Sequence, residues 1–244
     1  MSTAIPEIPM TARLRIETRK MFNTRGQILM FVGIGVFMLA MVALVFGTMS
    51  ADERTFGNIA QALLVPLIYL LPVVGIISMS SEWRGSAMVT YTLDPRRSRV
   101  FWAKVLVLVA LVIVLIASVM AVSAVLAWAT GAPFEPLRDI AMLHLGSLAG
   151  IGGLTLAGAG LGAALLNVAL GIVIQLAFMP LLPQVLSMSS VTKPIVPWVD
   201  LNGLMQLLLG AMWPDDLLKA ASVLTLWIAL PLVVGLWRNA HKEA

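Results

Sequence analysis

The residue types that most often do chemistry in proteins are scarce in this chain. Cysteine is absent, so the chain can form no disulfide, thiol nucleophile or Cys-ligated metal site. The two histidines, His144 and His241, lie far apart in the sequence and make a poor metal site. No Gly-x-x-x-x-Gly-Lys-[Ser/Thr] phosphate-binding loop occurs. We therefore expect this chain to hold no metal and no cofactor, and to hydrolyse no ATP by itself.

The composition is that of a membrane protein. The 244 residues are 60% hydrophobic and 11% charged, and the mean hydropathy is +0.97. A soluble domain carries about 25% charged residues, so this chain has too few to cover a water-exposed surface. A soluble enzyme and a disordered chain are both excluded. The net charge of +4 is more typical of basic loops beside a membrane than of nucleic-acid binding, and we expect no nucleic-acid partner.

Apolar runs predict an all-α integral membrane protein with one transmembrane domain, 1–244. Each crossing requires roughly 20 apolar residues, and Pro66 and Pro72 are expected to kink the second crossing. The stretch Ile140–Thr192 contains no Asp, Glu, Lys or Arg, which leaves room for two spans with a break near Asn167. The six predicted spans are 27–50, 56–81, 104–130, 141–164, 168–188 and 217–237.

The distribution of positive charge predicts the orientation of these spans. Of the 16 Lys and Arg residues, twelve lie in the N-terminal segment, the loop after the second span and the C-terminal tail. Cytoplasmic loops carry the excess of Lys and Arg in membrane proteins. Both termini are therefore predicted to be cytoplasmic.

The segment 9–25 predicts an amphipathic helix on the cytoplasmic membrane surface. Leu14, Met21 and Phe22 can share one helical face, while basic side chains point to anionic lipid headgroups. The simpler alternative is a positively charged topology anchor. The charged residues that we expect to matter here are Arg13, Glu17 and Lys20.

The cytoplasmic loop 82–103 is the obvious place for a soluble partner to dock. Ser86 can cap a short helix that runs to Leu93 and is stopped by Pro95, and an arginine cluster follows. A solvated, lipid-facing basic loop is the alternative that composition alone favours. The candidate docking residues are Glu82, Arg84, Gly85, Ser86, Met88, Tyr91, Leu93, Pro95, Arg96, Arg97 and Arg99.

This loop resembles the corresponding loop in permeases of the type-2 ATP-binding cassette (ABC) exporters. That family typically has a Glu, a basic residue and Gly-Thr, a Leu and a Pro-rich turn, a basic pair and then a Lys. The Pro-Arg-Arg-x-Arg-Val spelling is similar to actinobacterial members, and Ser86 departs from the usual Thr. The matching residues are Glu82, Arg84, Gly85, Ser86, Leu93, Pro95, Arg97, Arg99, Ala103 and Lys104.

The resemblance implies a six-span permease subunit of a bacterial plasma membrane exporter. ATPase subunits that bind ATP and Mg would dock on the cytoplasmic loop, and its short helix would couple their closure to the spans. A second permease subunit, identical or related, would complete the transporter. An apolar pathway favours a hydrophobic or amphipathic substrate such as a drug, a lipid or a peptide.

Two further features bear on packing and on the outer surface. Gly146 and Gly150, and Gly158 and Gly162, are small-xxx-small pairs that predict close helix packing within the subunit, with a dimer seam as the alternative. The apolar piece 201–212 predicts an interfacial or re-entrant helix in the outer leaflet before the last span.

The same sequence bears on other classes of function. No acidic residue lies within a span, although ion-coupled carriers usually need one there, so energy from a partner ATPase fits better. A non-transporting sensor or immunity subunit on a permease scaffold remains an alternative. A membrane-embedded enzyme is a weaker one, because paired aspartates, a Gly-x-Ser-Gly-like serine motif and clustered cytoplasmic acids are all missing.

Overall fold

The computed structural model describes residues 8–23, 25–80, 96–201 and 214–241, and every regular element within these ranges is helical. Six helical stretches there are long and apolar enough to cross a membrane, which confirms the predicted number of spans. They are α2 (Arg25–Thr48), α3 (Phe56–Ser80), α5 (Arg97–Thr130), α6 (Leu137–Leu165), Val168–Ser187 and Leu217–His241.

The main difference from the predicted spans is at the start of α5. The helix begins at Arg97, seven residues before the predicted start at 104, so the last part of the predicted loop 82–103 is helical. Hydropathy locates the apolar core of a span, whereas Arg and Lys are good helix formers that let the helix continue beyond it. The helix predicted within 86–93 lies outside the described residues, as does the outer helix predicted over 201–212, except for Leu201.

The predicted break near Asn167 is confirmed. Leu166 adopts a left-handed conformation with φ of 54° and ends α6. The Asn167 side chain then accepts a hydrogen bond of 3.2 Å from the Leu170 backbone N–H, which caps the next helix, α7 (Val168–Val173). A single polar residue thus separates two apolar helices.

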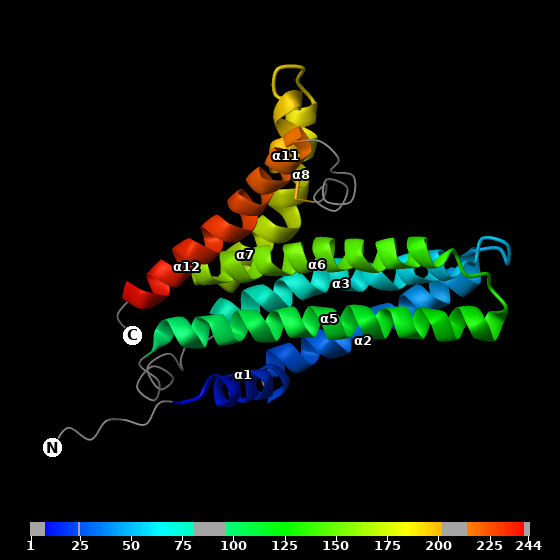
Figure 1. Cartoon of the computed structure of the whole chain (residues 1–244), viewed down its shortest axis with the longest axis horizontal. Coiled ribbons are helices and arrows are strands. Elements are labelled where there is room, and N and C mark those ends of the chain that lie inside the picture. The colour runs from blue at the N-terminus through cyan, green and yellow to red at the C-terminus, as the bar shows by residue number, and fades with distance from the viewer. Residues whose placement is uncertain (1–7, 24, 81–95, 202–213, 242–244) are drawn as a thin grey trace.

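The helices α2, α3, α5 and α6 form a bundle in which α3 is central and packs against the other three (Figure 1). Leu67, Leu71 and Ile76 of α3 are fully buried. Glycines allow α3 and α6 to approach closely: a Cβ atom on Gly162 would lie 2.6 Å from the Ile76 carbonyl oxygen, and one on Gly75 would lie 2.7 Å from the Thr155 carbonyl oxygen. Backbone-to-backbone contact therefore replaces side-chain packing along this seam.

The last two spans form a second arm that diverges from the bundle (Figure 1). One contains α7, the π-helical turn η2 (Ile174–Phe178) and α8 (Met179–Ser187). The other contains α11 (Pro214–Leu224), the π-helical turn η4 (Thr225–Ala229) and α12 (Leu230–His241). The arm joins the bundle where α12 packs on α6, with Gly160 against Pro231 and Gly235 against Ala163.

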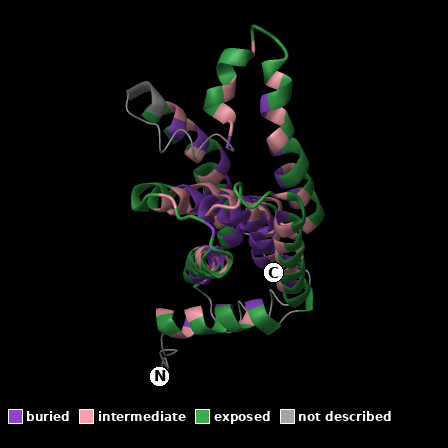
Figure 2. Cartoon of the chain, turned by 90° about the vertical axis from the view of Figure 1, so that its right-hand side faces the viewer, coloured by how far each residue is buried: buried purple, intermediate pink, exposed green. Residues whose placement is uncertain are grey.

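The helix α1 (Met10–Asn23) runs across one end of the bundle, the end near which both termini of the chain lie (Figure 1 and Figure 2). We call this the basic end, because α1, the start of α5 and the end of α12 carry most of the described Lys and Arg side chains there. The far end is formed by residues 49–55 and 131–136. The bundle's outer surface is apolar, with Leu39 71% exposed and Trp128 80% exposed, as expected of a surface solvated by lipid.

Candidate functional site

The basic end contains charged side chains that are buried rather than solvated. On α1, Arg13, Glu17 and Met21 follow one another at intervals of four residues and form the buried side of the helix. Phe22 lies outside this side, is 53% exposed and stacks on Phe31 of α2 at 5.1 Å between ring centroids. Of the predicted apolar face, Met21 is buried and Leu14 packs against the same cluster, whereas Phe22 is not, because α1 turns a mixed side with Arg13 and Glu17 toward the bundle.

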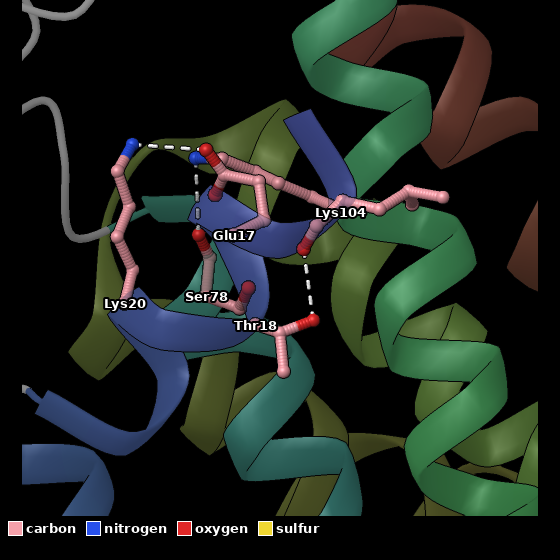
Figure 3. A network of polar contacts seen from close by, with 6 residues as sticks. Glu17, Thr18, Lys20, Ser78 and Lys104 are labelled. Atoms are coloured by element: carbon pink, nitrogen blue, oxygen red, sulfur yellow. Dashed lines mark hydrogen bonds and ion pairs between the residues drawn. The ribbon is translucent and has the colours of Figure 1, made fainter. Parts of the chain in front are cut away.

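Lys104 links α5 to the end of α3. Its side chain is 5% exposed, and its Nζ atom donates a hydrogen bond of 3.4 Å to the Ser78 carbonyl oxygen. Figure 3 shows this side chain extending from α5 toward Ser78 and the α1 segment that holds Glu17. The Glu17 carboxylate accepts from Lys20 at 2.9 Å. Buried charges persist only when they are paired or hydrogen-bonded. The Lys20–Glu17 pair lies within α1 and the Lys104 contact joins α5 to α3, whereas α1 is held on these two spans by Met21, which packs in one cluster with Val74 and Phe101.

The ends of α6 and α12 meet the same region. The Arg238 guanidinium of α12 donates to the Ala164 carbonyl oxygen in the last turn of α6. Arg97, in the first turn of α5, donates to the Asn239 carbonyl oxygen of α12 at 3.3 Å. Cations at helix C-termini satisfy carbonyl groups that have no partner within the helix. The basic end therefore joins the ends of α3, α5, α6 and α12 through backbone carbonyls.

These helix ends are also tightly packed. A void of only about 10 Å³ is lined by side chains from four helices, among them Met79 of α3, Phe101 and Lys104 of α5, Leu166 after α6 and Asn239 of α12. A displacement of any of these helix ends must therefore move its neighbours.

The predicted docking residues flank this junction only in part. Arg96 precedes α5, and Arg97 and Arg99 lie in its first turn. The others, Glu82, Arg84, Gly85, Ser86, Met88, Tyr91, Leu93 and Pro95, lie outside the described residues. In sequence, the segment 81–95 connects the last residue of α3 to the residue before α5, so both of its flanking helices belong to the junction.

A second candidate site is a cavity of about 710 Å³ between α3 and α6, in the half of the bundle nearer the far end, and it is also lined by Met49, which follows α2, and by Leu201. Asn58, Gln61 and Ser147 give it polar groups, and the other described lining residues are apolar or glycine. Sequence reasoning missed Gln61, although an amide within the apolar run 56–80 was a usable signal, because polar side chains within spans are costly and often functional.

The predicted glycine pairs divide between packing and this cavity. Gly158 and Gly162 pack against Pro72 and Ile76 of α3, which confirms close packing within the chain. Gly146 and Gly150 line the 710 Å³ cavity. An apolar groove of about 380 Å³ lies on another side of α6, between α5, α6 and the α11–η4 segment, where Ala149, Gly152 and Gly153 leave space.

The far end has its own polar arrangement. The Gly57 backbone N–H donates one bifurcated hydrogen bond to the two oxygens of the Glu135 carboxylate, at 2.9 and 3.0 Å, so Glu135 caps α3 from the loop between α5 and α6. Burial acts to raise the pKa of Glu135, but hydrogen bonds from the Thr55 hydroxyl and from backbone N–H groups outweigh it and lower the pKa below 4.5. Hydrogen bonds from Ser50 likewise lower the pKa values of Asp52 and Glu53.

Within the ranges that the structure describes, no three His, Asp or Glu side chains are grouped so that they could hold a metal ion. His144 and His241 are both described and lie on different helices, α6 and α12.

Comparison with known proteins adds no identification: no protein-family model, curated protein or solved structure matches the chain. The fold and its apolar surface define a multi-pass α-helical membrane protein. A more specific function must be argued from the residues at the basic end and in the cavities.

Proposed function

We propose that the chain is the transmembrane subunit of an ATP-driven exporter of the type-2 ABC class. Separate ATPase subunits would bind ATP and Mg, and a second permease subunit would pair with this one in a bacterial plasma membrane. The basic end would face the cytoplasm, where α1 would lie on the membrane surface. The segment 201–212 would cover part of the outer mouth.

The observation that carries the proposal is the junction at the basic end. The segment 81–95, which contains six of the ten exporter-like residues, connects α3 to α5 in the sequence. Lys104 ties these two helices together near Glu17 of α1, and Arg97 extends the connection to α12. A force applied to this segment by a partner would therefore reach α1, the bundle and the diverging arm together.

The cavity near the far end supports a hydrophobic or amphipathic substrate. Its described lining contains no Asp, Glu, Lys, Arg or His, so it offers no counter-charge to an ion. The Gln61 amide and the Asn58 amide provide donors and acceptors for a few polar groups, whereas the apolar majority of the lining suits a lipid-like body. A sugar would require many more hydrogen-bonding partners.

The test is copurification of the tagged chain with its ATPase from the native membrane. Replacing residues 86–93 by an equal-length Gly-Ser stretch keeps the chain connection between α3 and α5, so membrane insertion should be unchanged. We expect this variant to lose the ATPase almost completely, since the packed helix, not one surface ion pair of about 1 kcal/mol or less, would make the contact. Retention of the ATPase by the variant would contradict the proposal.

A substrate arm uses the same purified complex in liposomes. Amphipathic compounds should stimulate ATP hydrolysis in the wild type, and Gln61→Leu should weaken this stimulation by up to about tenfold, the value of one neutral hydrogen bond. Gln184→Leu, on the exposed surface of α8, is the matched control. An ATPase that is bound but unaffected by any compound would favour a sensor or immunity subunit instead.

A further inference from the structure

A cavity of about 560 Å³ lies at the basic end between the start of α1 and the first turns of α5. Its wall includes two cations, Arg13 and Arg99, the Ser98 hydroxyl and the Trp102 ring, with Ile8 and Met10 as apolar neighbours. None of the described lining residues is acidic. Arg99 is also one of the predicted docking residues, but the chemistry of this cavity requires no ATPase partner and no transported substrate.

The two arginines give the cavity the chemistry of a phosphate site. A guanidinium presents planar, paired N–H donors that match phosphate oxygens. Arg13 is 4% exposed, so its side chain is held in place before a ligand arrives, whereas the side chain of Arg99 is exposed. Ser98 and Arg99 also lie in the first turn of the 34-residue helix α5, whose N-terminal dipole favours an anion.

An apolar path leads away from this cavity along α5. Trp102, Leu106, Val109 and Ile113 follow Ser98 and Arg99 at intervals of three and four residues, so all six lie on one helical face. Trp102, Leu106 and Ile113 are 47%, 48% and 48% exposed. Val109 and Ile113 are also part of the wall of the 380 Å³ apolar groove between α5, α6 and η4.

The length of this path matches one leaflet of a bilayer. At a rise of about 1.5 Å per residue, the distance along α5 from Arg99 to Val109 is about 15 Å. The hydrocarbon core is about 30 Å thick, so one leaflet is about half of that. Trp102 lies one turn below the arginine, at the depth where interfacial aromatic residues occur. A free phosphate ion would use only the charged end of this arrangement.

We propose that this face of α5 binds one anionic phospholipid lengthwise. Its phosphate group lies between Arg13, Arg99 and Ser98, and an acyl chain follows Trp102 and Leu106 into the apolar groove at Val109 and Ile113. The bound lipid would contact α1 and α5 at its headgroup, and α5, α6 and the α11–η4 segment of the arm along its acyl chain. This proposal requires only a membrane protein and is independent of ATP-driven export.

Native mass spectrometry of the purified chain in a neutral detergent tests the site. Dioleoyl-phosphatidylglycerol should bind as a single tight equivalent, and dioleoyl-phosphatidylcholine should bind at least tenfold more weakly. Arg99→Gln should weaken phosphatidylglycerol binding by about tenfold, the effect of one charge-assisted hydrogen bond. Val109→Trp, which fills the groove and leaves the charged end intact, should weaken it as well.

The matched control is Arg96→Gln, an exposed arginine of the same segment that does not line the cavity, and its binding should equal that of the wild type. Circular dichroism establishes that each variant is folded. Equal binding of both lipids, or an equal loss in Arg96→Gln and Arg99→Gln, would overturn the proposal. Displacement of the lipid by millimolar inorganic phosphate together with an unaffected Val109→Trp would also overturn it, in favour of a simple anion site.

Discussion

Lys104 shows how one side chain can decide the arrangement of several helices. The residue is 5% exposed, and its ammonium group reaches the Ser78 carbonyl oxygen near the end of α3. Removing one partner of a buried charged contact is far more costly than losing a surface pair. Sequence reasoning counted Lys104 only as a family-like residue at the start of a span, because burial of a charge depends on neighbours that a sequence does not reveal.

Glu135 makes a prediction about pH at the residue scale. Its pKa is lowered in the folded chain, so its contribution to stability is fully present above about 4.5 and is lost as the pH falls through the lower folded value. Replacement by Gln removes the charge that caps α3 at Gly57. We expect Glu135→Gln to unfold about 2–4 °C below the wild type at pH 7, since a partly solvated cap contributes about 1 kcal/mol.

The difference between the two proteins should shrink toward zero as the pH is lowered from 5 to 3, because the wild type then loses its carboxylate. Thermal unfolding in detergent, followed by intrinsic tryptophan fluorescence, measures both midpoints. Asp139→Asn, an exposed carboxylate on α6, serves as the control and should not reproduce this pattern. A difference that stays constant across the range would mean that the charge of Glu135 does not matter.

At the scale of the elements, glycine positions within α6 separate close packing from open space. A Cβ atom at Gly162 would lie 2.6 Å from the Ile76 carbonyl oxygen, whereas one at Gly152 would meet only the Val112 Cγ1 atom at 3.8 Å. Gly162→Ala must push α3 and α6 apart, and we expect it to cost about 1–3 kcal/mol, the usual range for overpacking. Gly152→Ala should be neutral or slightly stabilising, because Ala favours the helix.

Unfolding both variants in mixed micelles with increasing SDS provides the measurement. Both substitutions add the same methyl group to the same helix, so helix propensity and hydrophobicity cancel between them. The packing interpretation fails if the two variants unfold at the same SDS fraction.

The elements also show which parts of the fold the sequence could predict. Hydropathy and the polar Asn167 located all six spans, because burial in a bilayer requires a long apolar run whatever the neighbours are. The π-helical turns η2 and η4 carry no comparable signal, since each inserts one residue into a turn without changing its composition. Gln175 of η2 is 4% exposed and its Oε1 atom has no hydrogen-bond partner, which no sequence pattern indicates.

The candidate site could be predicted less completely than the spans. The arginines of α5 were found from their charge, and Leu14, Met21 and Phe22 were predicted to share an apolar face of α1, but the burial of Arg13 and Glu17 beside Met21 was not predicted. An amphipathic pattern identifies an apolar face, and it cannot show that charged side chains of the same helix will be buried in the folded chain. The cavities between helices depend on how the spans diverge, which is a property of the whole chain.

At the scale of the whole molecule, the bundle and the diverging arm must cross one membrane in the same sense. Both start from the basic end, and their other ends are separated from each other (Figure 1). The charge distribution predicts that the basic end is cytoplasmic, so the far end of the bundle and the tip of the arm should both be outside. This arrangement requires the Val168–Ser187 and Leu217–His241 helices both to cross the membrane, and both are long and apolar enough to do so.

Cysteine labelling tests this arrangement cleanly, because the chain has no cysteine of its own. Ala51→Cys at the far end, Ser190→Cys at the tip of the arm and Arg15→Cys on α1 each place a thiol on an exposed position. On intact cells, a membrane-impermeant maleimide should label the first two and leave Arg15→Cys unlabelled until the membrane is permeabilised. The unsubstituted chain is the blank. If Ala51→Cys is labelled and Ser190→Cys is not, the arm does not cross the membrane. The prediction that its two long helices are spans would then be wrong.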